Sequence, residues 1–136
     1  AADVWSVTSF KELHRDALEA ERWNLLHPAN PERVPYVTEC LAGRPGPVVA
    51  VSDYVKALPE SIARFVPGRM LTLGTDGFGR SESRAALRDF FEVDAKHIAL
   101  ATLVGLMREG KLSFEDVTHA MRELEIDPAK RNPMNT

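Results

Sequence analysis

Apolar residues recur near the start of the chain with the spacing of an amphipathic helix. Leu13, Ala17 and Ala20 lie three or four positions apart, and Ser9 precedes them as a capping residue. The pattern predicts a helix from Ser9 to about Leu26. The segment 27–35 follows with three prolines, so we expect an extended connection there.

Three short apolar runs predict strands, at 4–8, 48–51 and 70–73. The middle run is continuously apolar, which is typical of a strand buried on both faces of a parallel sheet. Strands alternating with helices predict an α/β domain with an open, mostly parallel sheet and flanking helices. Three strands make a thin sheet. Either another element covers an edge, or the chain lacks a strand that its fold requires.

The rest of the pattern is helical. Pro59 should kink or split the helix that follows the second strand, and the polar tail 127–136 should be loosely held. We therefore divide the chain into a domain at 1–126 and a tail at 127–136. The further helices are expected at 36–41, from Ser52 or Asp53, at 83–91, at 94–108 with Asp94 as cap, and at 114–125 with a capping box of Ser113 and Asp116.

Composition narrows the function classes. The chain has 136 residues, 44% of them hydrophobic and 27% charged, which suits one globular domain. The net charge is −3 and the basic residues are scattered, so nucleic acid and membrane are not expected partners. The single cysteine, Cys40, fits a reducing cytoplasm. The chain lacks a starting Met, which suggests a processed or cut N-terminus.

A glycine-rich loop after the third predicted strand is the main candidate for a site. Residues 74–81 read G-x-x-x-x-G-R-S, one residue away from a phosphate-binding loop. The departure replaces the phosphate-contacting lysine with Arg80, and no later strand offers a magnesium-binding Asp. The alternatives are a tight strand-to-helix turn, or a loop that lines a site or an interface in a larger assembly. The candidate residues are Gly74, Thr75, Asp76, Gly77, Phe78, Gly79, Arg80 and Ser81.

No other catalytic, cofactor-binding or metal-binding constellation stands out. Asp76 and Glu82 could form an acid/base pair, although such carboxylates more often cap a turn. Cys40 is a weak nucleophile candidate, since it lies near the end of a short helix. The four histidines lack metal-ligand spacing, and the aromatic set near the first helix is expected in the core. These residues are His14, His27, His97 and His119, and Trp5, Phe10 and Trp23.

Several of these stretches resemble the C-terminal domain of homodimeric, thiamine-diphosphate-dependent decarboxylating enzymes of bacterial pyruvate dehydrogenase complexes. The match runs through 4–28 and 33–36 and is most specific at 73–81, which reads Leu-Gly-Thr-Asp-Gly-Phe-Gly-Arg-Ser. It continues through 83–94 and covers nearly the whole chain.

The resemblance implies a transketolase-like C-terminal domain whose first strand and helix lie upstream of residue 1. It implies a parent enzyme that uses thiamine diphosphate and Mg²⁺ to decarboxylate pyruvate and to acetylate a lipoyl group of the dihydrolipoyl acyltransferase, linking glycolysis to the citric acid cycle. The Gly-Asp-Gly…Asn motif that holds the cofactor in that family is absent here. We therefore expect a structural, dimerising segment, inactive alone, with the 74–81 loop at its contacts.

Two other functions remain open. One is a stand-alone α/β binding module that uses the Gly74–Ser81 loop for a phosphate ligand. The other is a related enzyme acting on sugar phosphates, which the residues at 23–24 and 74–81 disfavour.

Overall fold

The computed structural model describes all residues 1–136. Two strands and six α-helices form the fold, with two short 3-10 helices. Their bounds are α1 Phe10–Leu26, α2 Tyr36–Leu41, β1 Val48–Val51, α3 Ala57–Glu60, η1 Ala63–Phe65, β2 Met70–Leu73, α4 Arg84–Phe90, α5 Ala95–Arg108, α6 Phe114–Glu123 and η2 Pro133–Asn135. No helix has both the length and the apolar character needed to cross a membrane.

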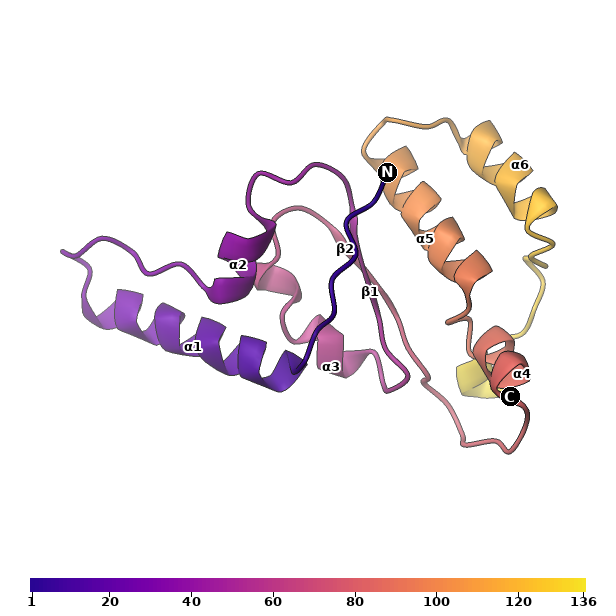
Figure 1. The fold of residues 1–136 in the computed structure, drawn as a ribbon, viewed down its shortest axis with the longest axis horizontal. Helices are drawn as coiled ribbons and strands as arrows, with labels where there is room; N and C mark the ends of the chain where they lie inside the picture. Colours follow the sequence, from indigo (N-terminus) through magenta and orange to yellow (C-terminus); the bar gives the residue numbers. More distant parts are fainter.

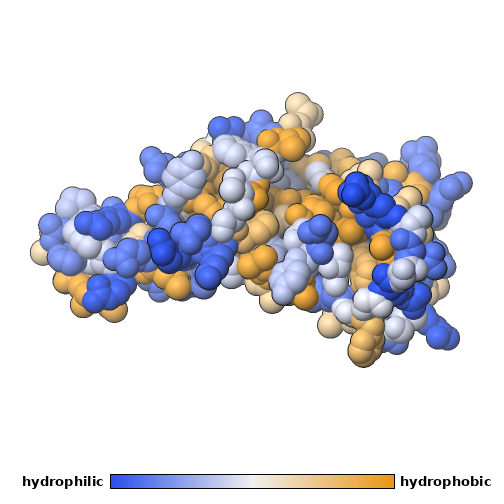
Figure 2. All heavy atoms as spheres, turned by 60° about the horizontal axis from the view of Figure 1, so that its bottom comes forward, coloured by the Kyte–Doolittle hydropathy of each residue, from blue (hydrophilic) through white to orange (hydrophobic).

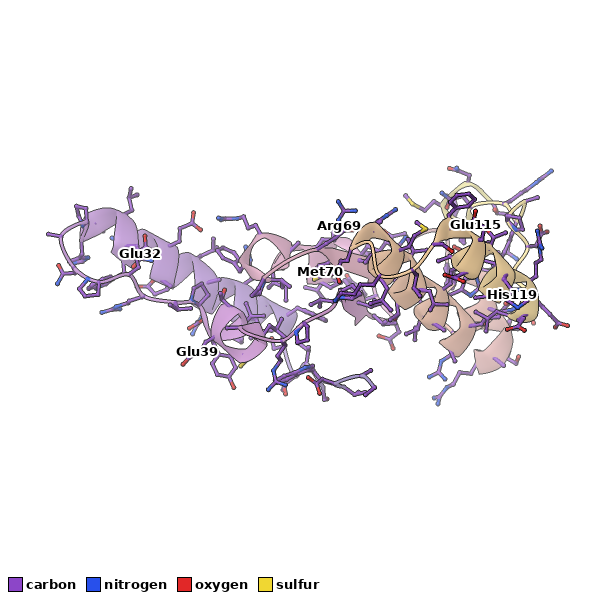
Figure 3. All side chains as sticks on the ribbon, turned by 90° about the horizontal axis from the view of Figure 1, so that it is seen from above. Glu32, Glu39, Arg69, Met70, Glu115 and His119 are labelled. Carbon is purple, nitrogen blue, oxygen red and sulfur yellow. The ribbon has the colours of Figure 1, made fainter.

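The molecule is elongated, with two helical lobes on either side of a small sheet (Figure 1). Helices α1, α2 and α3 make the N-terminal lobe, and α4, α5, α6 and the C-terminal turn make the other. Seen from above, Glu32 lies at the far end of the first lobe and His119 at the far end of the second, with Met70 between them (Figure 3).

The sheet is parallel, as the alternation of elements predicts. Strands β1 and β2 pair in register from Val48 opposite Met70 to Val51 opposite Leu73. Each strand has only one neighbour, so each has a free edge. The expectation that β1 is buried on both faces is wrong, because all four of its residues are only partly buried.

A small apolar core joins the N-terminal lobe to the sheet. Val37 of α2 packs with Ile62 and Val66, and Val48 and Met70 of the strands lie against them. Helix α1 begins as predicted, because the Ser9 hydroxyl accepts a hydrogen bond from the Glu12 N–H at 3.1 Å. Of the three aromatics expected in the core, Phe10 packs against it, while Trp5 is about half exposed and lies outside it.

Helix α5 covers the sheet from the C-terminal lobe. Gly105 makes this close packing possible: a Cβ built there would lie 2.5 Å from Pro47 Cβ and 3.2 Å from Leu71 Cδ1. The predicted caps hold, since Asp94 accepts from the His97 N–H and Ser113 forms a capping box with Asp116.

Residues 4–8 do not form the predicted strand. They have no regular secondary structure, no backbone ladder pairs them, and Val4 is 94% exposed. Strand propensity produces a strand only where a neighbouring backbone supplies hydrogen-bond partners. The sheet therefore has two strands instead of three.

Two further expectations are corrected. The helix expected from Ser52 or Asp53 begins only at Ala57, because the preceding residues bond instead to the loop after β2. The tail is not loosely held: Lys130 Nζ donates to the carbonyls of Asp89 and Phe90, and Pro133 is buried.

Candidate functional site

The first half of the glycine loop is bonded to the backbone that follows β1. The Thr75 N–H donates to the Tyr54 carbonyl at 2.9 Å, and the Thr75 hydroxyl donates to the Asp53 carbonyl at 2.9 Å. The Asp76 carboxylate accepts from the Lys56 N–H at 3.0 Å. These bonds connect the ends of the two parallel strands and fix the position of Lys56.

Gly74 leaves room for this arrangement. A Cβ at Gly74 would lie 2.6 Å from the Tyr54 oxygen and 2.9 Å from Lys56 Cγ. Such distances are shorter than van der Waals contact, so only glycine lets the stem of Lys56 cross the loop at this point.

Gly77 leaves room for the C-terminal tail in the same way. Its φ is +126°, and a Cβ there would lie 2.7 Å from the Pro133 oxygen. The two glycines therefore bring Lys56 from one side and the tail from the other against the same loop.

The second half of the loop is exposed. Phe78 is 77% accessible, and the Arg80 guanidinium lies 3.9 Å from the centre of the Phe90 ring. Helix α4 begins only at Arg84, three residues after Ser81. A phosphate-binding loop runs directly into the N-terminus of its helix, so the geometry here differs from that motif.

A pocket of about 440 Å³ lies between this loop, α5, α6 and the tail. Its lining is mixed, with polar side chains from segments far apart in the sequence. They are Lys56, Glu92, His97, Asp127, Lys130 and Asn132. Sequence reasoning singled out the loop but not this pocket.

His97 is the buried polar residue of the pocket, only 8% exposed. Its Nδ1 lies 2.5 Å from Asp94 Oδ1, which also accepts from the His97 N–H. Because an ionised carboxylate only accepts hydrogen bonds, Nδ1 carries the proton toward Asp94. The sequence signal for this pair was the cap Asp94 with a histidine three residues later.

Asp89, Asp94 and His97 are grouped closely enough to hold a metal ion. All three are already engaged, however, because Lys96 Nζ lies 2.9 Å from Asp89 and the other two bond to each other. The hydrogen bond from Lys96 holds the pKa of Asp89 below its usual value and raises the pKa of Lys96. The set is an ion-pair network at the start of α5.

The other residues considered from the sequence do not assemble a site. His27 donates from Nδ1 to the Trp23 carbonyl and stacks on the Trp23 ring, while His119 pairs with Glu123. Cys40 is half-buried, and its hydrogen bond with Tyr36 raises the pKa of the Tyr36 hydroxyl.

Comparison with known proteins identifies the family of this fold. Residues 1–94 match the family model of the transketolase-like C-terminal domain. The chain is 52% identical over 135 residues to the pyruvate dehydrogenase E1 component of Pseudomonas aeruginosa, covering 98% of this chain. It is 47% identical over its whole length to that of Mycobacterium tuberculosis, and 45% identical over 133 residues to that of Escherichia coli. The chain spans about 15% of the length of each of these relatives.

Proposed function

This chain belongs to the family of transketolase-like C-terminal domains, and we propose that it is a structural and dimerisation domain of a pyruvate dehydrogenase E1 component. The enzyme would decarboxylate pyruvate with thiamine diphosphate and Mg²⁺ and acetylate the lipoyl group of its acyltransferase partner. Its other domains, a second subunit and the acyltransferase are the partners, and the cytoplasm is the compartment that fits Cys40.

The observation that carries this proposal is the amount of exposed surface. The chain exposes 9557 Å², and only 12 of its 136 residues are buried. A self-contained protein of 15.1 kDa exposes roughly 7,100 Å² by the usual scaling of area with mass. The excess is about three times the ~800 Å² that one partner contributes to a standard interface.

The exposed surface includes large hydrophobic side chains, among them Val4, Leu25 and Phe78. Hydrophobic residues gather over the middle of the molecule, between the lobes (Figure 2). Large exposed apolar patches mark surfaces that other protein covers. Such covering by neighbouring domains and by a second subunit accounts for the excess without invoking a small-molecule ligand.

The residues of this chain do not fit the cofactor. Mg²⁺ requires near-octahedral oxygen ligands. The one group of side chains close enough to hold a metal ion, at the start of α5, includes His97, and its Asp89 is already paired with Lys96. We assign thiamine diphosphate and Mg²⁺ to other parts of the longer enzyme, and no catalytic residue to this chain.

The exposed half of the 74–81 loop provides the test. Phe78 and Arg80 offer an aromatic and a guanidinium group, residue types that often dominate interfaces. In the full-length protein we expect Phe78→Ser and Arg80→Ala to shift the dimer toward monomer on gel filtration and to lower the rate of pyruvate turnover.

Arg122→Ala is the matched control, because Arg122 is exposed on α6 and forms no ion pair. The control should leave both the elution volume and the turnover unchanged. If the loop variants also leave both unchanged, the loop is not part of the dimer interface.

A further inference from the structure

The exposed half of the glycine loop is held in place by very few contacts. Residues 77–82 form no hydrogen bond with any part of the chain. The nearest hydrogen bonds are those of Thr75 and Asp76 before the segment and the Ser83 cap of α4 after it. The conformation of this segment therefore depends on packing against its neighbours.

The first packing contact is at Gly77. Its φ is +126°, and a Cβ there would lie 2.7 Å from the Pro133 oxygen and 3.5 Å from Met134 Cα. The loop therefore lies directly on the backbone of the C-terminal tail, which only glycine allows at this distance. Pro133 is itself buried, so the tail gives the segment a fixed support at this end.

The second packing contact is at Arg80. Its guanidinium carbon lies 3.9 Å from the centre of the Phe90 ring, the last residue of α4. Between the two contacts, Phe78 is exposed and Gly79 has open space around it. The segment is thus attached at Gly77 and Arg80, and neither attachment is a hydrogen bond.

The tail also holds the residue on which Arg80 lies. Lys130 Nζ donates to the Asp89 carbonyl and, at 3.2 Å, to the Phe90 carbonyl. Helix α4 has no buried residue, so its position depends on such bonds and on the 2.9 Å ion pair of Asp89 with Lys96. Figure 1 shows the tail, in yellow, turning back beside α4.

Both attachments of the exposed segment therefore depend on the tail. Pro133 supports Gly77 directly, and Lys130 fixes Phe90, against which Arg80 packs. An undocked tail would leave residues 77–82 without support at either end. Docking of the tail and order in the segment are therefore linked, and each stabilises the other.

We propose that the C-terminal tail is a strap that holds residues 77–82 in their partner-binding conformation, with Lys130 as the positioning residue. This inference rests on the proposed interface role of Phe78 and Arg80. A preorganised segment binds more tightly, because it loses less conformational entropy on association. Since the linkage is reciprocal, the second subunit in turn keeps the tail docked.

The dissociation constant of the full-length dimer tests the strap, measured by sedimentation over a dilution series. Lys130→Met removes the ammonium but keeps an unbranched side chain, and it should raise the dissociation constant about fivefold or more. Lys130→Arg retains a cationic donor for the two carbonyls and should restore most of the affinity.

Arg131→Met is the matched control, because Arg131 is the next residue of the tail and is exposed. It should change the dissociation constant by less than about twofold, as surface substitutions away from such contacts do. Thermal unfolding of each variant checks the fold. If Lys130→Met does not fold, Asn132→Ala carries the test, since it removes only the side chain that caps the last turn of the tail.

A double-mutant cycle separates positioning of the loop from a general loss of stability. If Lys130 acts through Arg80, then Lys130→Met should add less than about twofold in an Arg80→Ala background. Effects that simply add would overturn the strap. So would an unchanged dissociation constant in Lys130→Met when Arg80→Ala alone weakens the dimer.

The remaining outcome distinguishes the strap from the interface itself. If Arg80→Ala leaves the dimer unchanged, the interface role of the loop is wrong, and the rate of tryptic cleavage after Arg80 in the full-length protein decides the strap alone. Faster cleavage in Lys130→Met than in Arg131→Met supports the strap, and equal rates overturn it.

Discussion

Gly77 illustrates how single residues bring distant segments together in this molecule. Its positive φ and its contact with the Pro133 carbonyl mean that a side chain meets both backbone strain and a steric clash. Gly79, two residues later, has open space around it. Two glycines of one motif therefore have different physical roles.

We predict that Gly77→Ala destabilises the chain by about 1–3 kcal/mol, the usual cost of forcing a side chain into a strained backbone position. Gly79→Ala should change the free energy of unfolding by no more than about 0.5 kcal/mol. Urea denaturation of both variants measures the difference. Equal effects would contradict both the positive φ of Gly77 and its contact with Pro133.

Sequence alone identified the glycine motif but not what its glycines contact. The sequence predicts a strand before the motif and a helix after it, and both are present. The neighbours of Gly74 and Gly77 are residues 54–56 and 133, about 20 and 56 positions away along the chain. Local pattern contains no information on such contacts, so the sequence did not identify Lys56 and Pro133 as residues that line a pocket beside the loop.

At the scale of elements, the ends of helices are where the sequence is most informative. The cap residues Ser9, Asp94 and Ser113 all act as predicted, because capping depends on residues three positions apart. Strands β1 and β2 also have the predicted bounds. The strand predicted at 4–8 is absent, because strand pairing depends on a neighbouring strand, which the local pattern does not specify.

The capping box of α6 gives a pH prediction. Hydrogen bonds from the Ser113 hydroxyl and backbone N–H hold the pKa of Asp116 below its usual 3.8. A carboxyl whose pKa is lower in the folded chain stabilises it above the unfolded pKa, and this stabilisation is lost as pH falls through the folded pKa.

Ser113→Ala should therefore lower the thermal midpoint of unfolding near neutral pH, because the cap and the hydrogen bonds to the Asp116 carboxylate are lost. The difference from the wild-type chain should shrink as pH falls below about 4. Thermal unfolding followed at several pH values measures this. A difference that is constant with pH would show that Asp116 takes no part in the cap.

For the whole molecule, the C-terminal tail links parts that are otherwise separate. Lys130 bonds to the end of α4, and Pro133 lies against the glycine loop. The tail thus joins the first and last segments of the second lobe and forms one wall of the pocket. Its polar composition did not reveal this, since the contacts use a lysine side chain and backbone carbonyls.

We predict that deleting residues 128–136 exposes the loop to proteolysis. Trypsin should cleave after Arg80 several-fold faster, because the loop loses its support at Gly77. Lys130→Met, which removes only the ammonium contacts, should have an intermediate effect. Mass spectrometry of the fragments identifies the cleavage site, and an unchanged cleavage rate would contradict the role of the tail.

The two-stranded sheet has one more consequence. Both outer margins of β1 and β2 present peptide N–H and C=O groups without a ladder partner, and such margins act as templates for any extended polypeptide that meets them. In a concentrated solution the isolated chain is thus expected to aggregate, because strands of different molecules can pair at these margins. Recombinant production is best attempted with a neighbouring segment that caps these margins, or at low concentration.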